Sequence, residues 1–145
     1  MLYSASGDEI TVAQLYPLLT LRSAVFVVEQ ESIYEDLDGR DLLPSTTHIW
    51  WQPAEEPHGY LRLLPDQDGT HRIGRVCTAK HARGAGLGAL LMKAAMERVG
   101  DDAAVLEAQT YAQAFYARFG FAATGEPYVE DGIEHITMRR PAQVS

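Results

Sequence analysis

The chain has 145 residues, of which 46% are hydrophobic and 22% are charged, and its formal net charge is −8. This length predicts a single domain over residues 1–145, too short for a nucleotide-binding domain together with a separate catalytic domain. The negative charge argues against nucleic acid as a partner, because phosphate contacts need clustered Lys and Arg side chains.

The N-terminal segment MLYSASGDEI has neither the basic region nor the apolar region of a secretion signal. No apolar run approaches the roughly 18 residues that a membrane span needs, so we expect no membrane association. The single Cys77 cannot form an internal disulfide and offers no cysteine cluster to a metal. We therefore expect a cytoplasmic monomer or homodimer with no metal.

The first predicted element is an amphipathic helix over roughly residues 12 to 28. Thr11 and Gln14 form a capping-box pattern at its start. Apolar positions and one arginine then recur at helical spacing: Leu15, Leu18, Leu19, Arg22, Val25 and Phe26. Pro17 conflicts with a helix that begins at Thr11, because an internal proline removes a hydrogen bond, and it fits a helix that begins near Tyr16.

The rest of the chain alternates strands and helices. IYEDLDGRDLLPSTT is polar and predicts a loop with a tight turn at Asp38-Gly39. HIWWQ and GYLRLL predict an antiparallel hairpin, and HRIGRVCTA predicts a third strand. LGALLMKAAMERVG predicts a helix that ends at Gly100. After it, AAVLEAQ predicts a strand, AQAFYARFG predicts a short helix, and the C-terminal residues predict two more strands. The order α-β-β-β-α-β-α-β-β predicts an α/β fold with a mixed sheet flanked by helices.

The segment ARGAGLGALL, between the third strand and its helix, holds three glycines in five residues. It fits two patterns, the dinucleotide pattern G-x-G-x-x-A and the acetyl-coenzyme A pattern R/Q-x-x-G-x-G/A. Either would hold a pyrophosphate on backbone N–H groups at a helix N-terminus. Glu107, at the end of the next strand, supports the dinucleotide pattern. However, five residues separate the strand from the first glycine, and too few residues follow Gly88 to complete a doubly wound domain. A tight turn without a ligand is a further alternative.

After the next strand comes a helix that carries FYARFGF. The glycine segment and FYARFGF together resemble the GCN5-related N-acetyltransferase (GNAT) superfamily. The segments LYPLLTLRSAVFVVEQ, YEDLDGRDL, THI, IGRVCTAKHARGAGLGALLM, AQTYAQAFYARFGF and YVEDGIEHITM, over about residues 14 to 138, resemble its ElaA-like branch. The resemblance implies a GNAT-type acyl-CoA N-acyltransferase fold, whose sheet splays open between the strand before the glycine segment and the strand after its helix, with acetyl-CoA in the opening.

The same resemblance implies a donor site and a reaction. Backbone groups of Val76, Cys77 and Thr78 would bind the pantetheine arm, N–H groups of Arg83, Gly84, Ala85, Gly86, Leu87 and Gly88 would hold the pyrophosphate, and Gln109 would also contact coenzyme A. Tyr116 matches the family tyrosine that lies near the sulfur and can protonate the departing thiolate. The implied reaction is direct attack of a primary amine on acetyl-CoA in a ternary complex, without an acyl-enzyme.

Such a reaction needs a base, because an amine with a pKa of about 10 is mostly protonated at neutral pH. The sequence leaves Glu29, Glu107, His48 and His135 as candidates. Both histidines are equally compatible with structural roles. Tyr116 could instead be a core aromatic residue, and Cys77 is expected to pack in the core rather than to act as a nucleophile.

The acidic loop suggests the acceptor end of the site. Arg22, Phe26, Glu35, Asp38, Asp41 and Arg62 are spaced in a way that is also similar to the acyl-homoserine lactone synthases, which move an acyl group to the amine of S-adenosylmethionine. This similarity implies that Arg22, Glu29, Asp36, Asp38 and Asp41 bind a small-molecule amine. Alternatively, Arg22 pairs with an acid of the loop and ties helix to loop. The alternatives to the acetyltransferase are thus an acyltransferase of that kind and a non-catalytic module that binds coenzyme A.

Overall fold

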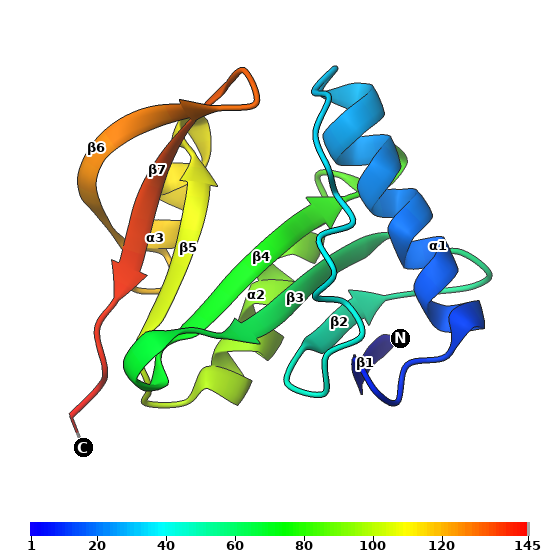
Figure 1. Cartoon of the computed structure of the whole chain (residues 1–145), viewed down its shortest axis with the longest axis horizontal. Helices are drawn as coiled ribbons and strands as arrows, with labels where there is room; N and C mark the ends of the chain where they lie inside the picture. Colours follow the sequence, from blue (N-terminus) through cyan, green and yellow to red (C-terminus); the bar gives the residue numbers. More distant parts are fainter. Residues whose placement is uncertain (145) are drawn as a thin grey trace.

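A computed structural model describes residues 1–144 (Figure 1). Seven strands form one mixed sheet in the order β1-β2-β3-β4-β5-β7-β6. The strands are β1 (Leu2–Ser6), β2 (Thr47–Trp51), β3 (Gly59–Pro65), β4 (His71–Thr78), β5 (Ala104–Gln109), β6 (Ala122–Glu130) and β7 (Ile133–Arg140). The helices are α1 (Val12–Arg22), the π-helix η1 (Ser23–Glu29), α2 (Leu87–Val99) and α3 (Gln113–Ala117), with short 3-10 turns η2 (Gln67–Gly69), η3 (Lys80–Ala82) and η4 (Thr110–Ala112). The predicted mixed α/β sheet is confirmed, and β4 with β5 is its parallel pair.

Strand β1 was not predicted. It pairs antiparallel with β2, from Leu2 opposite Trp51 to Ser6 opposite Thr47. As an edge strand it is half exposed, so its residues show no clear alternation of apolar and polar side chains. The Tyr3 ring stacks on Trp50, with ring centroids 5.6 Å apart.

The first helix begins at Val12, and its capping box is present. Thr11 Oγ1 accepts from the Gln14 N–H, and Gln14 Oε1 accepts from the Thr11 N–H. Pro17 lies inside α1, so the helix does not adopt the alternative start near Tyr16. The cap contributes about 1 kcal/mol. Burial of Leu18 and Leu21 adds roughly 1.5–3 kcal/mol each, which offsets the hydrogen bond that Pro17 removes.

The continuous helix Val12–Glu29 is long and apolar enough to cross a membrane by length and composition, contrary to our expectation that no run reaches this length. A helix packed in a protein core passes the same test. Here Leu18, Leu21 and Val25 pack with Trp50 and other residues of the sheet. One face of the helix is therefore part of the core of this fold.

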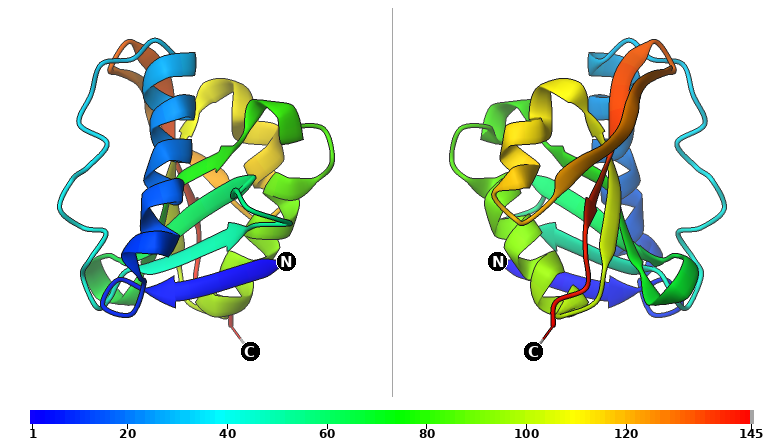
Figure 2. Two further views of the ribbon diagram at one scale, coloured as in Figure 1. Left: turned by 90° about the vertical axis from the view of Figure 1, so that its right-hand side faces the viewer. Right: turned by 90° about the vertical axis from the view of Figure 1, so that its left-hand side faces the viewer.

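Helices cover both faces of the sheet (Figure 2). Helix α1 with η1 packs on one face over a cluster that includes Trp50, Tyr60 and Cys77. Helices α2 and α3 pack on the other face, over the larger core that contains Leu61, Ile73 and many others. Cys77 is 5% exposed, so its expected place in the core is confirmed.

The sheet opens between β4 and β5. Their pairing is short, from His71 opposite Ala104 to Ile73 opposite Leu106, and the strands then diverge (Figure 1). Beyond Ile73 strand β4 carries a bulge, because Leu61 of β3 faces both Arg75 and Val76. Arg75 has φ +54°, a left-handed conformation that is uncommon for a residue other than glycine. Because a bulge bends the strand that carries it, β4 turns away from β5 at this point.

Candidate active site

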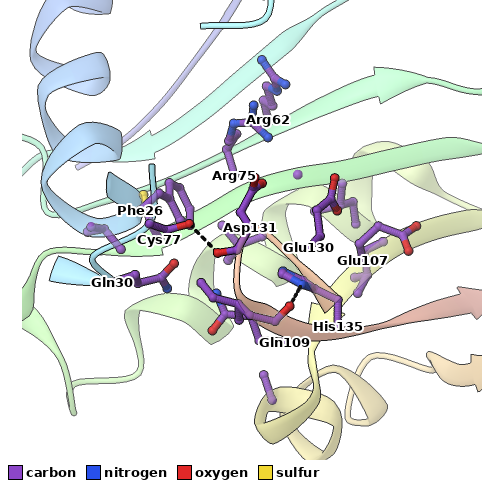
Figure 3. A pocket seen from close by; sticks show the side chains of 18 of the residues that line it. Phe26, Gln30, Arg62, Arg75, Cys77, Glu107, Gln109, Glu130, Asp131 and His135 are labelled. Atoms are coloured by element: carbon purple, nitrogen blue, oxygen red, sulfur yellow. Dashed lines mark hydrogen bonds between the residues drawn. The ribbon is translucent and has the colours of Figure 1, made fainter. Parts of the chain in front are cut away.

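A cleft of about 970 Å³ occupies the opening between β4 and β5 (Figure 3). Its walls come from η1 and the loop after it, β4, β5, α3 and the β6–β7 hairpin. Most residues expected at the donor site line it: Val76, Cys77, Thr78, Arg83, Gly88, Gln109 and Tyr116. Glu29, Glu35, Asp38, Glu107 and His135 also line it. The opening in the sheet therefore gathers donor-site candidates and acid–base candidates into one cavity.

The glycine segment joins η3 to α2 at one end of this cleft. Gly84 and Gly86 have φ values of +88° and +78°, which only glycine adopts readily. No atom lies within 4 Å of where a Cβ would stand on either residue, so the backbone is open to a ligand. On Gly88 a Cβ would lie 3.3 Å from Phe115 Cζ, so this glycine allows α3 to pack against α2. The open backbone and the positive end of α2 suit a pyrophosphate.

Arg83 connects the glycine segment to the end of η1. Its guanidinium donates to both carboxylate oxygens of Glu29, at 2.5 and 2.8 Å, and to the Thr78 carbonyl oxygen at 3.2 and 3.0 Å. The hydrogen bonds from Arg83 hold the pKa of Glu29 below its usual range. Glu29 is thus an ionised, paired carboxylate, which weakens it as a base.

Tyr116 lies on α3 and lines the cleft beside the divergent part of β4. Its ring packs edge-on against Phe115, with centroids 5.0 Å apart. Burial raises the pKa of Tyr116 to about 12. The phenol therefore stays protonated at neutral pH and can donate a hydrogen bond.

His135 lies on β7 and faces the same cleft (Figure 3). Its Nδ1 is 2.8 Å from the Ile133 carbonyl oxygen, which assigns the proton to Nδ1 and leaves Nε2 as the acceptor. The Tyr128 ring stacks on the imidazole, with centroids 5.8 Å apart and ring planes 20° apart. His135 lines the cleft, and within residues 1–144 only its Nδ1 has a hydrogen-bond partner, so Nε2 is the acceptor nitrogen that this candidate offers.

Glu107 is held by three donors. Thr137, Tyr128 and Arg72 donate to its carboxylate at 2.5, 2.7 and 2.9 Å. Burial alone would raise the pKa of Glu107, but these hydrogen bonds outweigh it and place the pKa below its usual range. Glu107 is therefore a satisfied anion and a poor base.

His48 does not lie in the cleft. It is fully buried, with Nδ1 2.6 Å from the Tyr60 hydroxyl and Nε2 2.8 Å from the Asp41 carbonyl oxygen. Burial lowers the pKa of His48. Both ring nitrogens are occupied within the protein, so the structure gives His48 the structural role and removes it from the candidate bases.

The expected acceptor residues Arg22, Asp36 and Asp41 also lie outside the cleft. Arg22 is fully buried and donates to Asp36 at 3.0 Å and to Asp41 at 2.6 Å. Arg62 donates to Asp41 at 2.9 Å and also pairs with Asp38. The structure thus favours the alternative, in which Arg22 ties the helix to the acidic loop. Asp38 lines the cleft, but Arg62 already occupies its carboxylate.

A family model of the acetyltransferase (GNAT) domain matches residues 9–141. The chain belongs to this family. Protein ElaA of Escherichia coli is 43% identical over 139 residues, which cover 92% of this chain and 91% of ElaA. The crystal structure of E. coli ElaA has a TM-score of 0.89, with coverage of 97% and 98%.

Two further relatives support the same placement of this GNAT chain. UPF0039 protein Rv2851c of Mycobacterium tuberculosis is 44% identical over 139 residues, which cover 93% of this chain and 89% of that protein. An acyl-CoA N-acyltransferase from Pseudomonas aeruginosa has a TM-score of 0.89 at 42% identity, with coverage of 97% and 99%. The ElaA-like branch and the acyl-CoA N-acyltransferase fold are both confirmed.

Several cleft residues of this GNAT domain were not found from the sequence. Arg75, Ser32 and Asp131 all line the cavity. The Asp131-Gly132 dipeptide is typical of a tight hairpin turn, so its position could have been anticipated. Arg75 had no such signature, because a left-handed arginine within a strand leaves no mark in the sequence.

Proposed function

We propose that this GNAT chain is a single domain over residues 1–145 that acts as an acetyl-CoA-dependent N-acetyltransferase in the cytoplasm and acetylates the primary amine of a small molecule. One observation carries the proposal. The opening between β4 and β5 runs continuously from the glycine segment to Tyr116 and His135. A donor held at one end would thus bring its acyl group to a hydrogen-bond donor and a base.

The donor side of the proposal rests on free backbone groups. In residues 1–144 the ladder between β4 and β5 ends at Ile73, so the edge of β4 from Gly74 to Thr78 that faces β5 has no strand partner there. This edge suits the amide groups of a pantetheine arm. The glycine segment, with the positive end of α2, suits the pyrophosphate.

The reaction side assigns one role to each of two residues. When bound, the thioester supplies the acyl group: the amine nitrogen bonds to its carbonyl carbon while the carbon–sulfur bond breaks. His135 accepts the proton of the attacking amine at Nε2. Tyr116 donates a hydrogen bond to the departing sulfur. A thiol with a pKa of about 8.5 leaves readily as a thiolate, so stabilisation of its charge is sufficient help.

The experiment is calorimetric titration with acetyl-CoA, followed by a thiol-release assay against a panel of amines. Tyr116→Phe should lower kcat by roughly 10²-fold and leave the acetyl-CoA Kd nearly unchanged, since only the hydroxyl is lost. Tyr16→Phe, on the exposed side of α1, is the matched control. Equal loss of turnover and affinity in Tyr116→Phe would indicate a packing role.

The same assay separates the alternatives. Binding of acetyl-CoA without turnover of any amine would favour a non-catalytic module that binds coenzyme A. Turnover that requires a long acyl chain and S-adenosylmethionine would favour the reaction of the acyl-homoserine lactone synthases. Absence of acetyl-CoA binding would contradict the whole proposal.

A further inference from the structure

Strand β1 forms one edge of the sheet, and β6 forms the other (Figure 2). In an antiparallel pair, hydrogen-bonded and non-hydrogen-bonded residues alternate along the strand. Met1 and Gln52 exchange both of their backbone hydrogen bonds, at 3.2 and 2.9 Å. The Gly7 N–H donates to the Thr46 carbonyl oxygen at 2.9 Å. The even-numbered residues of β1 therefore direct their N–H and C=O groups away from β2, toward the open edge. They are Leu2, Ser4 and Ser6.

Leu2 and Ser4 offer these outward groups to a partner, whereas Ser6 does not. The Ser6 carbonyl oxygen accepts from the N–H groups of Glu9 and Ile10, at 3.1 and 2.9 Å, so the chain itself covers that end of β1. Within residues 1–144 no strand lies beyond β1. Two N–H and two C=O groups, one of each from Leu2 and from Ser4, thus stand in a row where a further strand could pair.

The two edges of the sheet differ in their protection against such pairing. Bulges, prolines and charged side chains keep an exposed edge from pairing with another chain. Strand β6 has all three: its register shifts between Thr124 and Tyr128, and it contains Pro127. It also carries Glu126 and Glu130. The sequence LYSAS of β1 has neither proline nor charge, and its register with β2 is regular over five residues. Strand β1 is therefore the edge suited to pairing.

We infer that two copies of this chain associate through β1, antiparallel about a two-fold axis that passes between the two Tyr3 residues. In this register Leu2 of each copy lies opposite Ser4 of the other. Each such pair exchanges two hydrogen bonds, so all the outward groups of Leu2 and Ser4 are satisfied by four bonds in total. A register centred on Ser4 would need the covered carbonyl of Ser6, and one centred on Leu2 would leave Ser4 without a partner.

Side chains on both faces of β1 fit this register. Tyr3 is 40% exposed and stacks on Trp50, and the axis brings the two Tyr3 rings together as an aromatic cross-strand pair. On the other face, a hollow of about 320 Å³ lies between β1 and Ala94 of α2. Leu2, which is 41% exposed, comes opposite the small Ser4 of the other copy, beside this hollow. Each large side chain at this end of β1 thus gains an apolar neighbour.

Charge favours a second copy as the occupant of this edge. The net charge of −8 makes most of the surface repel another copy of the chain. Residues Leu2 to Gly7 carry no charged side chain, and the hollow contributes one charge of each sign, from Glu97 and Arg98. This edge therefore adds no net charge to the contact. A five-residue strand is only about 17 Å long, and stable interfaces bury about 800 Å² per partner, so we expect a reversible dimer with a micromolar Kd.

Sedimentation velocity over a concentration series tests the association. The mass of the native protein should rise from 16.0 kDa toward twice that value. Ser4→Pro removes the outward N–H of Ser4 from both copies, and with it two of the four bonds, so the dimer Kd should rise at least about fivefold. Proline is tolerated in an edge strand where the N–H faces away from the sheet, so the pairing with β2 is kept. Ser4→Ala retains the N–H and should dimerise like the native protein.

Cysteine cross-linking tests the register. The Cα atoms of a non-hydrogen-bonded antiparallel pair lie about 4.5 Å apart, within the range of about 4.4–6.8 Å that a disulfide spans. Tyr3→Cys should therefore form a covalent dimer on mild oxidation. The two Ala5 residues are offset by four positions in this register, or about 14 Å, so Ala5→Cys is the matched control and should stay monomeric. The native Cys77 is buried and should not cross-link.

This inference does not depend on the proposed function, because β1 is separated from the opening between β4 and β5 by β2 and β3. A native chain that stays monomeric throughout the series would overturn it, as would unchanged association in Ser4→Pro whose circular dichroism matches that of the native protein. Equal cross-linking of Ala5→Cys and Tyr3→Cys would overturn the register. Assemblies larger than a dimer would contradict a contact closed by a two-fold axis.

Discussion

The substitution Arg22→Met tests whether Arg22 has a structural role or binds the acceptor. The Arg22 side chain is fully buried, and it donates to Asp36 Oδ2, to the Asp36 carbonyl oxygen and to Asp41 Oδ1 at 3.0, 2.8 and 2.6 Å. Methionine has a similar length but no charge and no donor. Arg22→Met therefore leaves two buried carboxylates short of a partner while it keeps most of the packing.

The expected cost follows from the remaining contacts. Breaking a buried ion pair by removing one partner costs about 3–5 kcal/mol. Arg62 still donates to Asp41 at 2.9 Å and Arg75 lies 2.8 Å from Asp36, so the lower value, about 3 kcal/mol, applies. For a domain of this size each kcal/mol lowers Tm by roughly 2–4 °C, which predicts a fall of about 6–12 °C.

Urea denaturation followed by circular dichroism measures this loss. Arg98→Met is the matched control, because Arg98 is exposed and donates to the Ser4 hydroxyl at 2.7 Å; its effect should stay within about 0.5 kcal/mol. Folded Arg22→Met should bind acetyl-CoA with unchanged Kd, since Arg22 does not line the cleft. A variant of native stability that had lost amine binding would refute this reasoning and return Arg22 to the acceptor site.

Three further changes test separate contacts. Glu29→Gln removes a negative charge near the glycine segment and frees Arg83 to contact the phosphates of the donor. An exposed ion pair is worth about 0.2–1 kcal/mol, so calorimetry should show a Kd for CoA that is roughly two- to fivefold lower than in the native protein. A higher Kd would argue against competition between Glu29 and the phosphates for Arg83. The folded pKa of Glu107 lies below its unfolded value of about 4.3, so its stabilisation is present above that pH and is lost as the pH falls through the folded pKa. The stability gap between native protein and Glu107→Gln should therefore narrow below about pH 4, and a constant gap would contradict the assignment. A Cβ on Gly7 would lie 2.2 Å from the Leu43 carbonyl oxygen, so Gly7→Ala should lower the free energy of unfolding by about 1–3 kcal/mol in urea denaturation. Gly74→Ala is the control, because its Cβ would meet nothing within 4 Å and its backbone is not left-handed.

Much of the fold could be predicted because its determinants are local. The capping box at Thr11, the apolar stripe of α2 and the glycines at 84 and 86 depend on residues a few positions apart. The position of the glycine segment at one end of the cleft follows from the same local pattern, since this segment joins η3, the short turn after β4, to α2. These features need no knowledge of which distant residues meet.

The partners of charged side chains could not be predicted in the same way. Arg22 and Asp41 are 19 residues apart in the chain, and His48 meets Tyr60 from a neighbouring strand. A sequence shows that such groups exist, but burial and register decide whether each faces a ligand or another side chain. For this reason the sequence analysis predicted that the acidic loop binds the acceptor amine, whereas in the structure most carboxylates of this loop are paired with arginines.

The bulge in β4 links the buried ion pairs of Arg22 and the acidic loop to the shape of the cleft. Ile73 and Cys77 are four residues apart and would share one face of a regular strand, yet they pack in different cores on opposite faces, because the bulge adds a residue between them. The left-handed conformation of Arg75 costs about 1–3 kcal/mol, so other contacts must hold it. Arg75 donates to the Asp36 carbonyl oxygen at 3.1 Å, and Asp36 is fixed in turn by Arg22. The acidic loop thus shapes the cleft indirectly, because it stabilises the strained residue Arg75 at the point where β4 diverges from β5.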